Sequence, residues 1–497
     1  MISPAQSKEH EDEAWYSRRG SFRYRLQHLL FRLSKGLIKS PMYYRSLAFH
    51  AKRDSEGDRE RPIPDAEHVR VYGIWTTEFF TPDNVHNLSR QLERLEASQP
   101  TIPGRSLAEF LENQRANPGS SLELYLFPPG EKRLPFSSGH QCELPRFASS
   151  AQGTVTMLTP SLTALVTYFK LREGERSRIE EAVHRTYQTR VTPWGTGVTA
   201  SSPSLERRAH INRIRGEWRA EATKWHRKNF RGLLSNNGEE PEMCELAVLE
   251  GVSEGSREMM DALALSFSYS KFAGPAGDAS KPIRYFPYLG GDDLQSHSVM
   301  ALDSAQLPHI DTSGYQAGET GAAHYVDSQF RATFCVWALL RVFRFYQRRL
   351  AKTRDGAANV IGNARASKAL AKVRADFAVC VDAASIGREL LEIDSTFARY
   401  QSDIDLEPES SDWPQSSQTL VEVIQEELPR QAQGLLRNVE DLNSALQSQA
   451  NLLSAHANLR LQPWIILLAL LSLIVGAIAA GPVIANLASN FSTSMRP

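Results

Sequence analysis

The chain has 497 residues, of which 41% are hydrophobic and 23% are charged, so it can bury a large core and form about two to four domains. Lys plus Arg and Asp plus Glu each number 57, so the net charge indicates no charged partner, and a nucleic-acid partner is not expected. The four cysteines are far apart without CxxC spacing, which argues against a cysteine zinc site and a disulfide framework and favours a reducing compartment.

Residues 1–53 are predicted to be a basic amphipathic N-terminal segment. The stretch from Ala14 to Arg53 holds ten Lys or Arg and no Asp or Glu, and its apolar residues recur at helical spacing. Such a helix packs on the protein core, lies on an anionic membrane surface, or contacts nucleic acid or another partner. The first thirteen residues are acidic and contain no apolar run, so we do not expect a secretory signal peptide. Residues 54–67 read as a charged linker that contains proline.

Residues 68–305 are predicted to form a mixed α/β cytosolic domain. Short runs rich in Val, Thr and aromatic residues predict strands, and amphipathic segments with capping residues predict helices between them. The expected strands are 69–75, 122–127, 153–158, 163–171, 246–249, 266–270 and 284–289. The expected helices are 82–98, a short one opening at 106, 173–188 and 204–230.

Long helices are predicted after residue 320. Residues 320–400 read as a helical hairpin, in which the second helix has apolar residues at coiled-coil spacing, and residues 401–417 read as an acidic loop. Residues 418–462 are expected to be a stalk helix that opens with the capping box Thr419 to Glu422. Its apolar seam, from Leu435 to Leu446 and beyond, can be filled within one chain or between chains, so a homo-oligomer through the stalk is one expectation.

The C-terminal region is predicted to be a membrane anchor. No charged residue lies between Arg460 and Arg496, and 463–485 has the roughly 20 residues that a transmembrane helix needs. The basic residues before this segment favour a cytoplasmic N-terminus, with residues 486–497 as a short tail on the opposite side of the lipid bilayer. The anchor side chains would be Trp464, Ile465, Leu468, Leu471, Ile474 and Ile478. The predicted fold class is therefore α+β, followed by long helices, a coiled-coil stalk and one transmembrane helix.

The segment 453–462 followed by the apolar run is similar in style to the stalk-to-membrane junction of CorA-type divalent cation transporters. The order of a mixed α/β domain, long helices and a stalk also resembles that family. The resemblance covers roughly residues 363–485. It implies an oligomer that transports ions, whereas the family's Gly-Met-Asn signature and second span are absent here.

Two groups of residues are candidate metal ligands. Asp292 and Asp293 follow an expected strand, where paired carboxylates can hold Mg²⁺ or simply form a turn. His309, Asp311, His324 and Asp327 gather within a short stretch, and such side chains can bind a transition metal, although polar loops also collect them. No P-loop, HExxH, GxSxG or dinucleotide fingerprint is present, so no catalytic or cofactor-binding residue is predicted and any cofactor is unknown.

Three hypotheses for function follow. The first is a membrane-anchored sensor, scaffold or effector whose cytosolic domain binds a partner or ligand. The second is an oligomeric CorA-like channel or transporter, and the third is a membrane-tethered, metal-dependent enzyme that uses the candidate ligands above. Because no catalytic signature is found, we do not expect an enzyme.

Overall fold

The computed structural model describes residues 46, 49, 68–97, 106–114, 120–130, 139–194, 197–251, 263, 272–274, 283–287, 298–309, 319–363, 366–392, 406–408 and 419–494. The chain divides into two compact units. The sheet unit comprises Met1–Ala338 and Ser395–Gln425, and the helical unit comprises Leu339–Asp394 and Glu426–Pro497.

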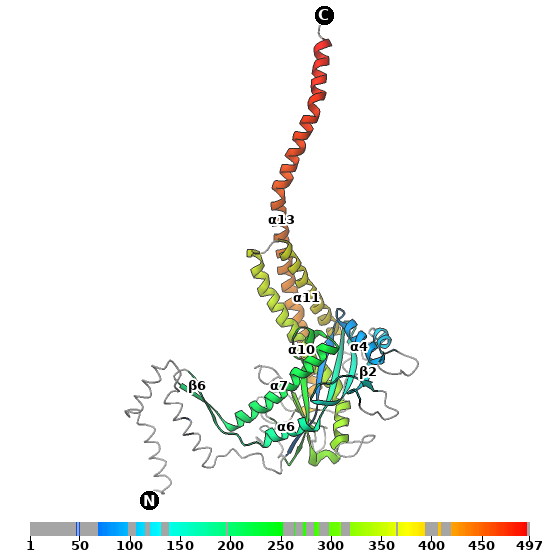
Figure 1. Ribbon diagram of the computed structural model, residues 1–497, viewed down its shortest axis with the longest axis vertical. Coiled ribbons are helices and arrows are strands. Elements are labelled where there is room, and N and C mark those ends of the chain that lie inside the picture. Colours follow the sequence, from blue (N-terminus) through cyan, green and yellow to red (C-terminus); the bar gives the residue numbers. More distant parts are fainter. Residues whose placement is uncertain are drawn as a thin grey trace, which may run out of the picture. The chain divides into compact units, whose positions relative to one another are not determined.

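Within the described residues, the sheet unit is built on a mixed sheet of ten strands, part of which is seen in Figure 1. Its strand order is β12-β9-β10-β11-β8-β1-β5-β4-β2-β3, and the central strands β1 and β5 pair antiparallel, with Thr76 opposite Thr167. The bounds are β1 His68–Phe80, β2 Ser121–Phe127, β3 His140–Gln141, β4 Ala148–Thr159, β5 Leu162–Leu171, β8 Glu242–Glu250, β9 Phe272–Gly274, β10 Ile283–Phe286, β11 Ser298–Asp303 and β12 Glu407–Pro408. A separate hairpin pairs β6 Arg190–Trp194 with β7 Gly197–Ser201.

Helices cover one face of this sheet. They are α4 Val85–Ala97, α5 Leu107–Gln114, α6 Glu173–His184 and α7 Pro203–Asn229. Their apolar residues join those of the strands in one buried cluster, in which Trp218 of α7 lies against Phe147. The helix α7 begins where the sequence dictates, since the Ser202 side chain accepts the Leu205 N–H and Pro203 occupies the first turn. Because the apolar residues of α6 and α7 are buried in this cluster, the two helices are held against the sheet.

The first half of α10 (Glu319–Asn363) covers the opposite face. Trp75 of β1 packs against Phe330 of α10 at 5.3 Å between ring centroids, and its indole N–H donates to the buried Asp327 carboxylate at 2.7 Å. Asp327 also pairs with Arg331, and the Arg331 guanidinium donates to Thr154 of β4 at 2.7 Å. This buried network joins α10 to β1 and β4, the two strands on either side of β5.

Three further buried charged residues, an ion pair and a single carboxylate, fix the other face. Arg215 of α7 pairs with Glu245 of β8, and their side chains are 2% and 0% exposed. Glu78 of β1 is fully buried and accepts N–H bonds from Leu234 at 2.8 Å and from Ser235 at 2.9 Å, within the short helix α8 (Leu233–Asn236). The ordinary cost of a buried carboxylate is thereby offset by donors from the start of α8.

The helical unit consists of the second half of α10, α11 (Ala366–Glu392) and most of α13 (Leu420–Ser494). In Figure 1 the first part of α13 runs beside α10 and α11. Gly387 of α11 lies close to Leu436 of α13, where an added Cβ would come within 3.1 Å of the leucine side chain. Gln347 of α10 donates to Gln431 of α13 at 2.9 Å. The buried core of this unit includes Leu350, Val373, Cys380, Ile386, Leu435, Val439, Leu442 and Leu446.

Most of the expected elements are confirmed, with shifted ends. The capping box is reciprocal, because Glu422 N–H bonds the Thr419 hydroxyl at 3.3 Å and Thr419 N–H bonds the Glu422 carboxylate at 2.6 Å. The seam predicted on α13 is buried from Leu435 to Leu446. The seam predicted on α11 drifts by one position, since Ile386 and Leu390 are buried and Ala384 is only half-buried. The strand expected at 266–270 and the N-terminal segment 1–53 lie outside the described ranges, apart from residues 46 and 49.

The expected C-terminal membrane span is contradicted. Among the described residues, no helix combines the length and the apolar character that crossing a bilayer requires. The transmembrane helix at 463–485, the single-pass membrane localisation and the anchor are corrected accordingly. The supposed anchor residues Trp464, Ile465, Leu468 and Leu471 are exposed side chains of α13, and the side chains of Ile474 and Ile478 are not described.

Candidate metal centre

Three potential metal ligands come together in the sheet unit, beside the first residue of β1. His68 is the first residue of β1, and Glu180 and His184 lie four residues apart on α6, which places both on one helical face. An adjoining face of α6 packs on the core through buried residues that include Ile179 and Val183. The helix is therefore held beside the sheet with Glu180 and His184 turned toward His68.

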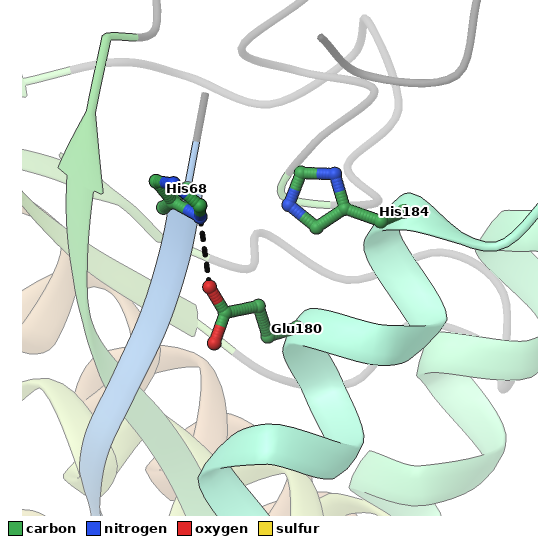
Figure 2. A group of neighbouring side chains, drawn as sticks. All are labelled: His68, Glu180 and His184. Carbon is green, nitrogen blue, oxygen red and sulfur yellow. Dashed lines mark hydrogen bonds and ion pairs between the residues drawn. The ribbon is translucent and has the colours of Figure 1, made fainter. Parts of the chain in front are cut away.

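The three side chains point toward one another in Figure 2. Their ligand atoms all lie within 4.8 Å of each other, and His68 Nδ1 is 2.8 Å from Glu180 Oε1. The rings of His68 and His184 are 5.6 Å apart between centroids, edge to face. His68 and Glu180 are 34% and 33% exposed, so the group is accessible to solvent. No other group of three or more His, Cys, Asp or Glu ligands converges in this way within the described part of the chain.

Two imidazoles and one carboxylate suit a divalent transition metal, above all Zn²⁺. Ligand atoms of a tetrahedral zinc site lie about 3.3 Å apart, given bond lengths near 2.0–2.1 Å. Small side-chain rotations would bring this group to that spacing. His184 is the last residue of α6, where the helix dipole favours a cation. Three protein ligands leave a fourth position for water or an incoming ligand.

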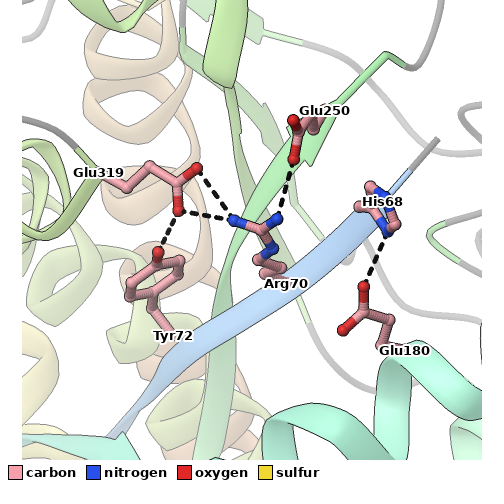
Figure 3. A network of polar contacts seen from close by, with 6 residues as sticks. All are labelled: His68, Arg70, Tyr72, Glu180, Glu250 and Glu319. Atoms are coloured by element: carbon pink, nitrogen blue, oxygen red, sulfur yellow. Dashed lines mark hydrogen bonds and ion pairs between the residues drawn. The ribbon is translucent and has the colours of Figure 1, made fainter. Parts of the chain in front are cut away.

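A second polar network continues along β1 from the metal candidates (Figure 3). Arg70 donates to Glu250 of β8 at 3.0 Å and to Glu319, the first residue of α10, at 3.3 Å. Tyr72 also donates to Glu319, and the guanidinium of Arg176 lies 4.8 Å from the centre of the Tyr72 ring. Burial, followed by Glu319, raises the pKa of Tyr72 to about 12, so this hydroxyl remains a donor at neutral pH.

The ligands predicted from sequence are not brought together among the described residues. Asp292, Asp293 and Asp311 lie outside the described ranges, and the side chain of His309 is not described, so these remain predictions. His324 is exposed on α10. The carboxylate of Asp327 is buried and engaged by Arg331 and Trp75, which gives it a structural role.

The sequence interpretation missed His68, Glu180 and His184. The expected helix 173–188 contained the pair, and a Glu followed four residues later by His is a recognisable arrangement on one helical face. The third ligand lies 112 residues before Glu180, and only the packing of α6 beside β1 reveals the group.

The fold and the site thus define a class, a mixed α/β protein with a candidate divalent-metal centre. No protein-family model, no curated protein and no solved structure matches the chain. The class therefore rests on the fold and on the geometry of the site, and the resemblance to CorA-type transporters stays a prediction.

Proposed function

We propose that the protein is a sensor or effector whose sheet unit binds Zn²⁺ or a similar divalent transition metal through His68, Glu180 and His184. The convergence of three ligand atoms within 4.8 Å, from β1 and from one face of α6, carries this proposal. The ligand types are those that zinc prefers, and the partial exposure of the group lets an ion enter from solvent. The channel hypothesis is not carried forward, because it requires a membrane span.

The connection of the metal ligands to α10 favours sensing. His68, Arg70 and Tyr72 are every second residue at the start of β1, so their side chains lie on one side of the strand. A metal that draws His68 toward His184 would move the strand segment that holds Arg70 and Tyr72. Both residues bond Glu319, whose position at the N-terminus of α10 is favourable for a negative charge. Since α10 continues from the sheet unit into the helical unit, occupancy of the metal centre can be transmitted along this helix.

Zinc titration of the full chain, followed by calorimetry or by a competing chelating dye, tests the metal centre. We expect one tight site whose affinity falls at least about tenfold in His184→Ala and in Glu180→Gln, because each removes one of three ligands. The matched control is His86→Ala, which removes an exposed histidine on α4. Zinc affinity that is equal in all three variants and the unaltered chain would refute the proposal.

Hydrogen exchange in the first turns of α10, with and without Zn²⁺, tests the sensing step. We expect the metal to change protection of residues 319–330 in the unaltered chain and to leave it unchanged in Arg70→Ala. Unchanged protection in a chain that demonstrably binds Zn²⁺ would reduce the proposal to metal binding without transmission.

A further inference from the structure

A second cluster of polar side chains lies beyond the C-terminal end of α6. Tyr187, in the segment between α6 and β6, donates its hydroxyl to the Ala182 carbonyl at 3.0 Å, and that hydroxyl lies 2.7 Å from Nδ1 of His210 on α7. The guanidinium carbons of Arg185 and Arg207 each lie 6.0 Å from the centre of the Tyr187 ring. The loop after α6 and the first turns of α7 therefore meet around one aromatic ring.

The electrostatics of this cluster are dominated by positive charge. Arg185, Arg207 and Arg213 all act to lower the pKa of Tyr187, against the larger opposing effect of burial. Burial, Arg213 and Arg185 together lower the pKa of His210. Glu217, the carboxylate that opposes them at His210, is already paired with Arg178. An anion placed here would meet several guanidinium groups.

Arg207 is the most informative member of the cluster. It is 4% exposed, yet within the described residues its guanidinium makes no hydrogen bond or ion pair, and its Nε is buried without an acceptor. Two other buried arginines of α7 do have a carboxylate partner: Arg215 pairs with Glu245, and Arg219 pairs with Glu240. Burying a guanidinium without an anionic partner is unfavourable, so the place of that partner at Arg207 is open to a ligand.

The ligand class follows from the surroundings of Arg207. This residue lies in the second turn of α7, near the positive end of the helix dipole. Guanidinium groups bind phosphate oxygens in a bidentate manner, which suits the doubly charged phosphate monoester. We propose that Arg185 and Arg207, which lie beside Tyr187 next to His210, bind the phosphate group of a small phosphorylated ligand. This site is separate from the metal-binding function and does not depend on it.

Calorimetric titration of the full chain with inorganic pyrophosphate, in excess EDTA to exclude the metal centre, tests the proposal. We expect saturable binding that weakens about tenfold or more in Arg207→Gln and in Arg185→Gln, since each loses a charge-assisted contact. The matched control is Arg227→Gln, which removes the same charge from an exposed position at the opposite end of α7 and should leave affinity within about twofold. Absence of pyrophosphate binding, or equal loss in all three variants, overturns the proposal.

Two further measurements make the outcome decisive. If circular dichroism shows that Arg207→Gln does not fold, Arg185→Gln decides alone, because Arg185 is exposed and its removal leaves the core intact. Vesicles that contain phosphatidic acid form the second arm. Binding to vesicles without binding to pyrophosphate would assign the site to a lipid surface and overturn the small-ligand proposal.

Discussion

The sheet unit and the helical unit differ in what they bury. Within the described residues, the sheet unit buries charged groups that include Glu78, Arg215, Glu245, Asp327 and Arg331, whereas Thr353 is the one polar residue among the buried side chains of the helical unit. The charged groups of the sheet unit hold specific partners across strands and helices. The described core of the helical unit is built almost entirely from aliphatic and aromatic side chains. The comparison indicates that directional bonds specify the sheet unit and that apolar packing specifies the helical unit.

The largest expected effect breaks a buried ion pair in the sheet unit. Arg215→Ala leaves the fully buried Glu245 without its guanidinium partner, and we expect a loss of about 3–5 kcal/mol in the free energy of unfolding. Urea unfolding followed by circular dichroism measures this loss. A loss below about 1 kcal/mol would show that Glu245 is satisfied without Arg215.

The next effect removes apolar packing from the helical unit. Leu435 is fully buried on α13, so Leu435→Ala should cost about 2–5 kcal/mol through lost burial and the cavity left behind. Leu452→Ala, at a position of the same helix that is 61% exposed, is the control and should change stability by less than about 0.5 kcal/mol. Equal effects of the two substitutions in urea unfolding would contradict the assignment of the seam.

A pH dependence sharpens the contrast for the sheet unit. His226 of α7 is fully buried against Thr76, and burial lowers its pKa to about 3. At a pH between about 6.5, the pKa of His226 in the unfolded chain, and about 3, its pKa in the folded chain, only the unfolded chain binds this proton. The free energy of unfolding therefore falls as the pH falls through this range. We expect the unaltered chain to lose about 1.4 kcal/mol more per pH unit than His226→Gln below pH 6. Parallel stability curves of the two proteins would show that His226 is protonated in the folded state.

The smallest effect concerns a surface ion pair of the helical unit. Arg430 lies beside Glu427 on α13 and is 72% exposed. Arg430→Ala should alter the free energy of unfolding by no more than about 0.5 kcal/mol, because solvent screens the pair. A change comparable to that of Arg215→Ala would remove the distinction drawn between the two units.

The sequence predicted those parts of the fold that depend on local patterns. The strands 122–127 and 163–171, the helix 204–230 and the capping box at Thr419 are set by alternation, amphipathic spacing and capping, and the structure confirms them within a few residues. The short strands β9 and β12 were missed because they have only three and two residues, too few to show a period. The apolar composition of 463–485 predicted a span that the described residues do not support.

The candidate site was beyond the reach of sequence patterns for a different reason. Glu180 and His184 form a local pair, but His68 joins them only through the sheet. Arg207 differs from Arg215 only in lacking a carboxylate partner, which its own sequence segment does not reveal. Such relations between distant residues follow from tertiary packing, and periodicity within one segment does not contain them.

The pairing of β8 has a consequence for how the chain folds. β8 pairs antiparallel with β1 on one side and parallel with β11 on the other, and the parallel partner is reached only after a long crossover. Pairings of high sequence separation form slowly, so β8 is expected to spend part of the folding reaction as an open edge. Its residues from Met243 to Leu249 are all buried in the native sheet. Until β11 pairs with it, β8 would expose an unpaired, largely apolar edge to other copies of the chain. Aggregation during refolding, rather than low final stability, is then the expected hazard in handling this protein.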